Sequence, residues 1–63
     1  MDNSSLGLVL KLGQENDWKP EDMDYLQKGE YADEALSEII DFTNSGKLPS
    51  RRDVHYIIQH IED

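Results

Sequence analysis

The 63-residue sequence contains no cysteine, and its aromatic residues are limited to one tryptophan, one phenylalanine and three tyrosines. Without cysteine, disulfide bonds cannot stabilise the fold. A core built from so short a chain rarely gives more than about 3–5 kcal/mol of net stability. Small chains therefore usually add a disulfide, a metal or a partner. With disulfides excluded, the remaining sources of stability are close helix packing, self-association and a binding partner.

Long hydrophobic runs are also missing. The apolar run from Leu6 to Leu12 is far too short to cross a bilayer. The first residues lack the basic start of a signal peptide. We therefore expect one small domain over residues 1–63, located in the cytoplasm and not associated with a membrane.

Basic residues are scarce: six lysines and arginines stand against fourteen acidic residues, which gives a net charge of -8. Most of the acidic residues lie between Glu15 and Asp41. An acidic chain repels phosphate, so direct binding to nucleic acid or to anionic lipid is disfavoured. The charge either keeps the protein soluble or complements a basic protein surface.

The stretch from Glu30 to Asn44 has the strongest pattern in the chain and predicts a central helix with two distinct faces. Its apolar residues recur at spacings of three and four and are Ala32, Ala35, Leu36, Ile39, Ile40 and Phe42. Its acidic residues fall on the opposite side and are Glu30, Glu34, Glu38 and Asp41. One face therefore requires a core, and the other requires water or a cation.

The segment before Glu15 is ambiguous. Alternating leucines from Leu6 to Leu12 are typical of a strand, but Ser4 or Ser5 can also cap a helix. We favour the helix, because no second strand is available and a lone strand leaves its backbone unpaired. Leu8 and Leu12 would then give this helix a second apolar side. That excess of apolar surface predicts an intermolecular contact, for which a homodimer is one form.

A short helix is predicted to begin at Pro20 and to end at Gly29, although it could continue through Gly29 into the central helix. Met23 and Leu26 would face inward. Trp18 precedes this helix and is expected to fold over the core, since lone tryptophans usually pack.

The last helix is predicted to follow a left-handed turn at Gly46, with Ser50 and Asp53 forming a short version of the capping box. Its apolar stripe consists of Val54, Ile57, Ile58 and Ile61. The short connection favours an antiparallel pairing with the central helix, with Ile39 and Ile57 at their interface. The predicted fold is all-α, with three or four short helices and a C-terminal antiparallel helical hairpin.

No catalytic or metal-binding motif is recognisable. His55 and His60 lie about 140° apart around a helix, so one helix face cannot present both to a metal. Asp22 and Asp24 have the first spacing of an EF-hand loop without its glycine or final glutamate. A chain this short can hardly build the cleft that a nucleophile and base require. We therefore expect neither an enzyme nor a cofactor.

Tyr56 is predicted to point away from the apolar stripe of the last helix, with Arg52 one turn before it. An exposed aromatic beside an arginine has the composition of a binding hot spot. The alternatives are a local stack of Tyr56 on Arg52, or coverage of Tyr56 by the N-terminal segment.

Two nucleic-acid-related alternatives remain open. The C-terminal hairpin could act like a helix-turn-helix, with Arg51 and Arg52 at the start of a recognition helix, although the net charge opposes DNA. Conversely, the acidic residues of the central helix could mimic DNA and occupy a basic groove of another protein.

The whole chain, from MDNSSLGLVLKLGQENDW to RRDVHYIIQHIED, resembles the small proteins encoded in the exo-xis region of lambdoid bacteriophages. That region is associated with early lytic development and with the balance between lysis and lysogeny. The resemblance implies a phage regulatory or host-takeover protein in the bacterial cytoplasm. We expect the protein to act by binding another protein, which could be a copy of itself, a host factor or both. The resemblance rests on overall likeness and transfers no site residues.

Overall fold

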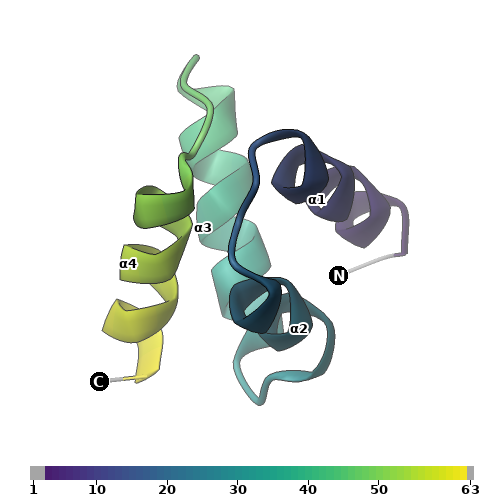
Figure 1. The fold of residues 1–63 in the computed structure, drawn as a ribbon, viewed down its shortest axis with the longest axis vertical. Coiled ribbons are helices and arrows are strands. Elements are labelled where there is room, and N and C mark those ends of the chain that lie inside the picture. The colour runs from purple at the N-terminus through teal and green to yellow at the C-terminus, as the bar shows by residue number, and fades with distance from the viewer. Residues whose placement is uncertain (1–2, 63) are drawn as a thin grey trace.

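The computed structural model describes residues 3–62, which form four α-helices and contain no β-strand (Figure 1). The helices are α1 (Asn3–Glu15), α2 (Pro20–Lys28), α3 (Ala32–Asn44) and α4 (Arg51–Glu62). The all-α prediction is confirmed. The first segment is a helix, so the strand alternative is wrong, and α2 and α3 are separate helices.

α3 is the centre of the fold and contacts each of the other three helices. α4 runs antiparallel beside it, which confirms the predicted hairpin, while α1 and α2 lie on its other side (Figure 1). Ala35 and Ile39 of α3 have no exposed surface. The apolar face of α3 is therefore covered from several directions at once.

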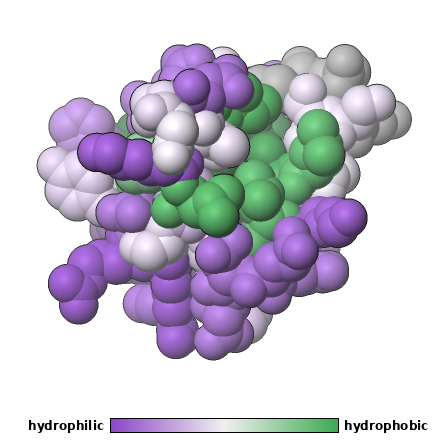
Figure 2. Space-filling model, turned by 90° about the horizontal axis from the view of Figure 1, so that it is seen from above, coloured by the Kyte–Doolittle hydropathy of each residue, from purple (hydrophilic) through white to green (hydrophobic). Residues whose placement is uncertain are grey.

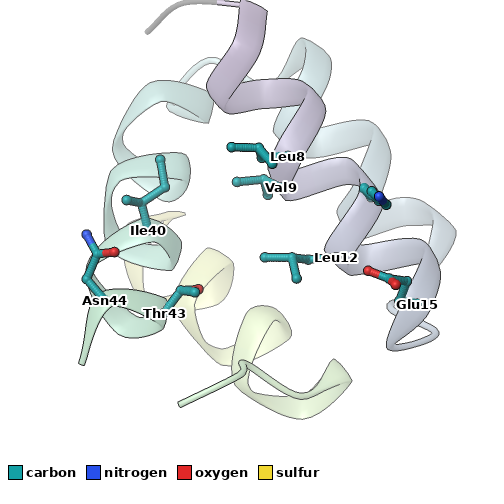
Figure 3. A pocket seen from close by; sticks show the side chains of 8 residues that line it. Leu8, Val9, Leu12, Glu15, Ile40, Thr43 and Asn44 are labelled. Carbon is teal, nitrogen blue, oxygen red and sulfur yellow. The ribbon is translucent and has the colours of Figure 1, made fainter. Parts of the chain in front are cut away.

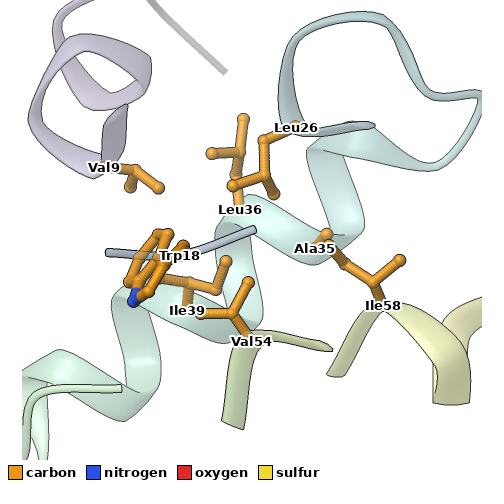
Figure 4. Packing of buried hydrophobic residues seen from close by; sticks show 8 residues of the cluster. All are labelled: Val9, Trp18, Leu26, Ala35, Leu36, Ile39, Val54 and Ile58. Atoms are coloured by element: carbon orange, nitrogen blue, oxygen red, sulfur yellow. The ribbon is translucent and has the colours of Figure 1, made fainter. Parts of the chain in front are cut away.

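The core gathers side chains from every helix and from the loop between α1 and α2 (Figure 4). Its buried members are Val9, Trp18, Leu26, Ala35, Leu36, Ile39, Val54 and Ile58. Met23 packs against this cluster but is only partly buried. Phe42, predicted on the same face of α3 as Ile39, is also only partly buried.

The predicted interface of α3 and α4 is confirmed at Ile39 but not fully at Ile57. Val54 and Ile58 are buried, whereas Ile57 is partly buried and packs against the cluster from its edge. The reason is geometric: Val54 and Ile58 are one turn apart and face α3 together, which leaves Ile57 about 60° to one side of Val54.

Trp18 is buried, with 4% of its surface exposed, and its indole Nε1 donates a hydrogen bond of 3.0 Å to the carbonyl oxygen of Pro49. The predicted position over the core is thus confirmed. This bond joins the α1–α2 loop to the α3–α4 loop. Because a buried indole N–H without a partner is costly, the bond also fixes the orientation of the ring.

Gly13 lies where α1 approaches Trp18 and Met23 most closely. A Cβ atom at this position would meet the Met23 sulfur, and it would lie 2.7 Å from Cε3 of Trp18 and 2.8 Å from Cε of Met23. Real Cβ atoms do not approach other heavy atoms so closely, so Trp18 and Met23 would have to shift to admit any larger residue here.

The predicted helix ends are mostly confirmed. Pro20 is the first residue of α2 and Gly29 its C-cap, and Gly46 adopts φ 95° after α3. The Ser50 backbone N–H donates to Asp53 Oδ2 at 3.0 Å, and the Asp53 backbone N–H donates to Ser50 Oγ at 3.2 Å. The pKa of the Asp53 carboxyl is lowered, mainly by the hydrogen bond from the Ser50 backbone and to a smaller extent by hydrogen bonding with the Ser50 side chain.

Two predicted helix starts are wrong. α3 begins at Ala32, so Glu30 lies in the turn before it, where the Ala32 backbone N–H donates to the Gly29 carbonyl at 3.2 Å. α1 begins at Asn3, which places Ser4 and Ser5 inside its first turn and not at its cap. In both cases the predicted start differs from the observed one by only a few residues. The spacing of apolar residues does not define a helix end that closely.

The two glycines of α1 provide a matched test of this packing. A Cβ atom at Gly7 would meet no heavy atom within 4 Å, so Gly7→Ala should stabilise the protein by about 1 kcal/mol through helix propensity. Gly13→Ala gains the same propensity but should destabilise the protein, because Trp18 and Met23 must move. Chemical denaturation followed by circular dichroism measures both. Equal stabilisation by both substitutions would contradict the close packing at Gly13.

A second pair of variants tests the interface of α3 and α4. Ile39→Ala should cost about 2–5 kcal/mol, enough to unfold most of a domain this small, because the side chain is fully buried. Ile57→Ala should cost clearly less, about 1–2 kcal/mol, since Ile57 is partly exposed. Thermal melts would contradict this arrangement if Ile39→Ala retained a cooperative and barely shifted transition.

Candidate protein-binding surface

A groove on the surface between α1 and α3 is lined largely by aliphatic side chains (Figure 3). Its volume is about 360 Å³. Leu8, Val9 and Leu12 of α1 point across it toward Ile40 of α3. The polar residues along its edges are Lys11, Glu15, Thr43 and Asn44. The groove therefore offers a hydrophobic floor with polar groups only at its rim.

Leu8 is the unusual residue of this groove, because 68% of its surface is exposed. Leu12 and Ile40 pack partly against the core, and Val9 is buried. Figure 2 looks onto the end of the molecule where α3 finishes and shows hydrophobic side chains gathered at its centre, bordered by hydrophilic ones. The predicted second apolar side of α1 is thus real at Leu8, whereas Leu12 is shared between groove and core.

The acidic residues predicted to bind a partner lie on α3 and in the turn before it, and none of them lines this groove. Glu30, Glu34, Glu38 and Asp41 are all exposed. Asp41 lies one turn before Asn44 at the groove rim, whereas Glu34 and Glu38 lie farther back along α3 and about 80–120° around it from Asn44. The structure therefore places Asp41 beside the groove that Leu8 and Leu12 line, and the other acidic residues farther from it.

Tyr56 and Arg52 belong to a different surface. Tyr56 is 69% exposed on α4, as its helical position predicts. Its ring stacks on that of His60, with centroids 6.1 Å apart and planes 10° apart, whereas the sequence suggests Arg52 as its local partner. Arg52 is exposed and lines a second hollow, together with Lys19 and His55. The structure does not bring Tyr56 and Arg52 to the apolar groove.

Sequence reasoning missed a contact between α2 and α4, in which the Asp22 carboxylate is buried and the His55 ring is partly exposed. Asp22 is 4% exposed, and Nδ1 of His55 lies 3.3 and 3.2 Å from its two carboxylate oxygens. A buried carboxylate needs hydrogen bonds in place of water, and His55 supplies them. The two residues are 33 positions apart, so no spacing rule connects them.

The same pair lies within a group of potential metal ligands. Side-chain ligand atoms of Glu21, Asp22 and His55 all fall within 4.8 Å of one another. However, His55 already engages Asp22, and Lys19 Nζ lies 4.0 Å from Glu21 Oε1. Arginines 51 and 52 line the hollow beside His55 and add further positive charge. These cations oppose a metal ion, and the arrangement fits a structural hydrogen-bonded pair.

Comparison of the chain with protein-family models, with curated proteins and with solved structures finds no match. Each helix within residues 3–62 is too short or too polar to span a membrane.

Asp22 and Asp24 allow a matched test of the Asp22–His55 contact, because both aspartates are on α2 and only Asp22 is buried. Asp22→Ala should destabilise the protein by about 1–3 kcal/mol, since it removes the hydrogen bonds and leaves His55 without its partner. Asp24→Ala should change stability by less than about 0.5 kcal/mol. Urea denaturation near neutral pH measures the difference, and equal effects would show that the Asp22–His55 contact contributes nothing.

Proposed function

We propose that the protein acts by binding another protein through the groove between α1 and α3. The observation that carries this proposal is the exposure of Leu8 above an apolar hollow. Burying such a side chain is worth about 1.5–3 kcal/mol, so a surface that leaves it in water gains by being covered. Apolar patches with polar borders are typical of interaction sites.

The charge distribution supports a protein partner over nucleic acid. The net charge is -8, and α3, which forms one wall of the groove, carries acidic residues and no basic one. Phosphate groups would be repelled from this side of the molecule. Arg51, Arg52 and Lys19 do line a second hollow at the start of α4, but three cations do not offset the field of the whole chain.

The resemblance to the small exo-xis proteins of lambdoid phages gives this proposal a biological setting. The protein would act in the cytoplasm of the bacterial host during early lytic development. Its target would be a host factor, and binding would shift the balance between lysis and lysogeny. Self-association through Leu8 is the competing use of the same groove.

Leu8→Gln and Leu48→Gln form a matched pair for testing the proposal. Both leucines are exposed, Leu8 at 68% and Leu48 at 60%, but only Leu8 lines the groove. A host protein captured from bacterial lysate by the wild type should be retained by Leu48→Gln and reduced by about tenfold with Leu8→Gln. Isothermal titration calorimetry with the purified captured protein should give similar affinities for the wild type and Leu48→Gln, and a weaker affinity for Leu8→Gln.

Two further variants separate the alternatives. Tyr56→Ala shows whether the α4 surface takes part, because Tyr56 is exposed and does not line the groove. Analytical ultracentrifugation of the wild type and of Leu8→Lys reveals self-association. Capture that is unchanged in Leu8→Gln, or that depends on Tyr56 alone, would contradict the groove as the binding site.

A further inference from the structure

Resting on the proposed function, we infer that the occupant of the groove is an amphipathic helix of another protein, with basic residues along the flank that faces α3. The groove between the two helices extends on α1 from Leu8 to Glu15. That length of helix spans about 10 Å at roughly 1.5 Å per residue. A helix with apolar residues at i, i+3, i+4 and i+7 presents anchors over the same length.

A helix suits this groove better than an extended segment. The groove floor is made of aliphatic side chains, and no β-strand within residues 3–62 offers an edge for pairing. An extended peptide would therefore place its backbone N–H and C=O groups over a surface that cannot bond them. A helix bonds its own backbone and presents only side chains to the groove.

The two walls of the groove differ in charge. α1 carries one lysine and one glutamate, Lys11 and Glu15, and its side chains are neutral in sum over Asn3–Glu15. α3 carries no basic residue, and its acidic residues are Asp33, Glu34, Glu38 and Asp41. The charged residues that line the groove, Lys11 and Glu15, are both on α1 and cancel, whereas α3 brings Asp41 to within one turn of Asn44 at the rim. The α3 side of the groove is therefore the more negative one. A bound helix would gain from lysine or arginine on that flank, while its other flank meets a neutral wall.

A second copy of this chain fits the groove poorly. Both arginines of the chain are on α4, but the apolar stripe of this helix is turned inward, with Val54 and Ile58 buried. α1 has an exposed apolar residue at Leu8 but only Lys11 as a cationic side chain. Two copies, each with a net charge of -8, also repel each other. The charge and burial pattern favours a different protein that carries a basic amphipathic helix.

Two synthetic 16-residue helical peptides test the inference. Both carry leucine at i, i+3, i+4 and i+7, and one has lysine where the other has glutamate along one flank. Fluorescence anisotropy should show the lysine peptide binding about tenfold or more tightly than the glutamate peptide at low salt. The difference should shrink at roughly 300 mM salt, where the Debye length falls to about 6 Å.

Variants of the protein locate the interaction. Leu8→Gln should abolish peptide binding, since Leu8 lines the groove. The double variant Glu34→Gln/Asp41→Asn should weaken the lysine peptide by about threefold to tenfold and leave the glutamate peptide no weaker. The control double variant Asp24→Asn/Glu62→Gln removes the same number of exposed charges from α2 and α4, and it should have a smaller effect.

The outcomes separate this inference from the proposed function. Equal binding of both peptides, lost in Leu8→Gln, would overturn the basic flank and leave the groove as a protein-binding site. Binding of neither peptide, with host-protein capture still dependent on Leu8, would overturn the helical occupant alone. A wild-type dimer that Leu8→Lys dissociates would make a second copy the occupant and also overturn the inference. Failure of both peptide binding and Leu8-dependent capture would remove the proposed function itself.

Discussion

The burial of one face of α3 is the constraint on which the rest of the structure depends. A chain of 63 residues without cysteine has no disulfide to limit the unfolded state, so its stability comes from packing. α3 contacts all three other helices and supplies Ala35, Leu36 and Ile39 to the core. Ala35 and Ile39 have no exposed surface, because the neighbouring helices together cover this face. Each other helix is held in place mainly by what it contributes to that face.

The groove follows from the same constraint. α1 must direct Val9 into the core, and Gly13 allows the end of the helix to approach Trp18 and Met23. With that orientation fixed, Leu8 lies about 100° away from Val9 around the helix and projects beyond the core. Within residues 3–62, no other helix extends far enough to cover Leu8, which stays 68% exposed. The exposure of Leu8 is therefore a consequence of the orientation of α1 that buries Val9 in the core.

Most of the fold could be predicted from the sequence, because local chemistry determines it. Pro20, Gly46 and the Ser50–Asp53 capping box define helix ends through bonds between near neighbours. The 3.6-residue periodicity of α3 and α4 identifies their buried faces. Leu8 and Tyr56 are exposed for the same reason, since their positions on each helix lie outside the face that packs on the core.

What could not be predicted depends on contacts between distant parts of the chain. Asp22 has the sequence context of an ordinary first-turn carboxylate, and only the packing of α4 against α2 makes it buried and bonded to His55. Gly13 has the sequence context of a helix-weakening residue until Trp18 is placed against it. The groove itself requires the relative position of α1 and α3, which no pattern within either helix contains.

The bond between Trp18 and Pro49 has a practical consequence for spectroscopy. Trp18 is the sole tryptophan, so intrinsic fluorescence excited at its absorption edge comes from one indole at one site. That indole is shielded from water, its N–H is held by the α3–α4 loop, and Val9 lies in the same cluster while also lining the groove. Its emission wavelength therefore reports the closure of the two loops over the core, independently of the helical signal. Trp18 is therefore a built-in fluorescent probe at the point where the core meets the two loops.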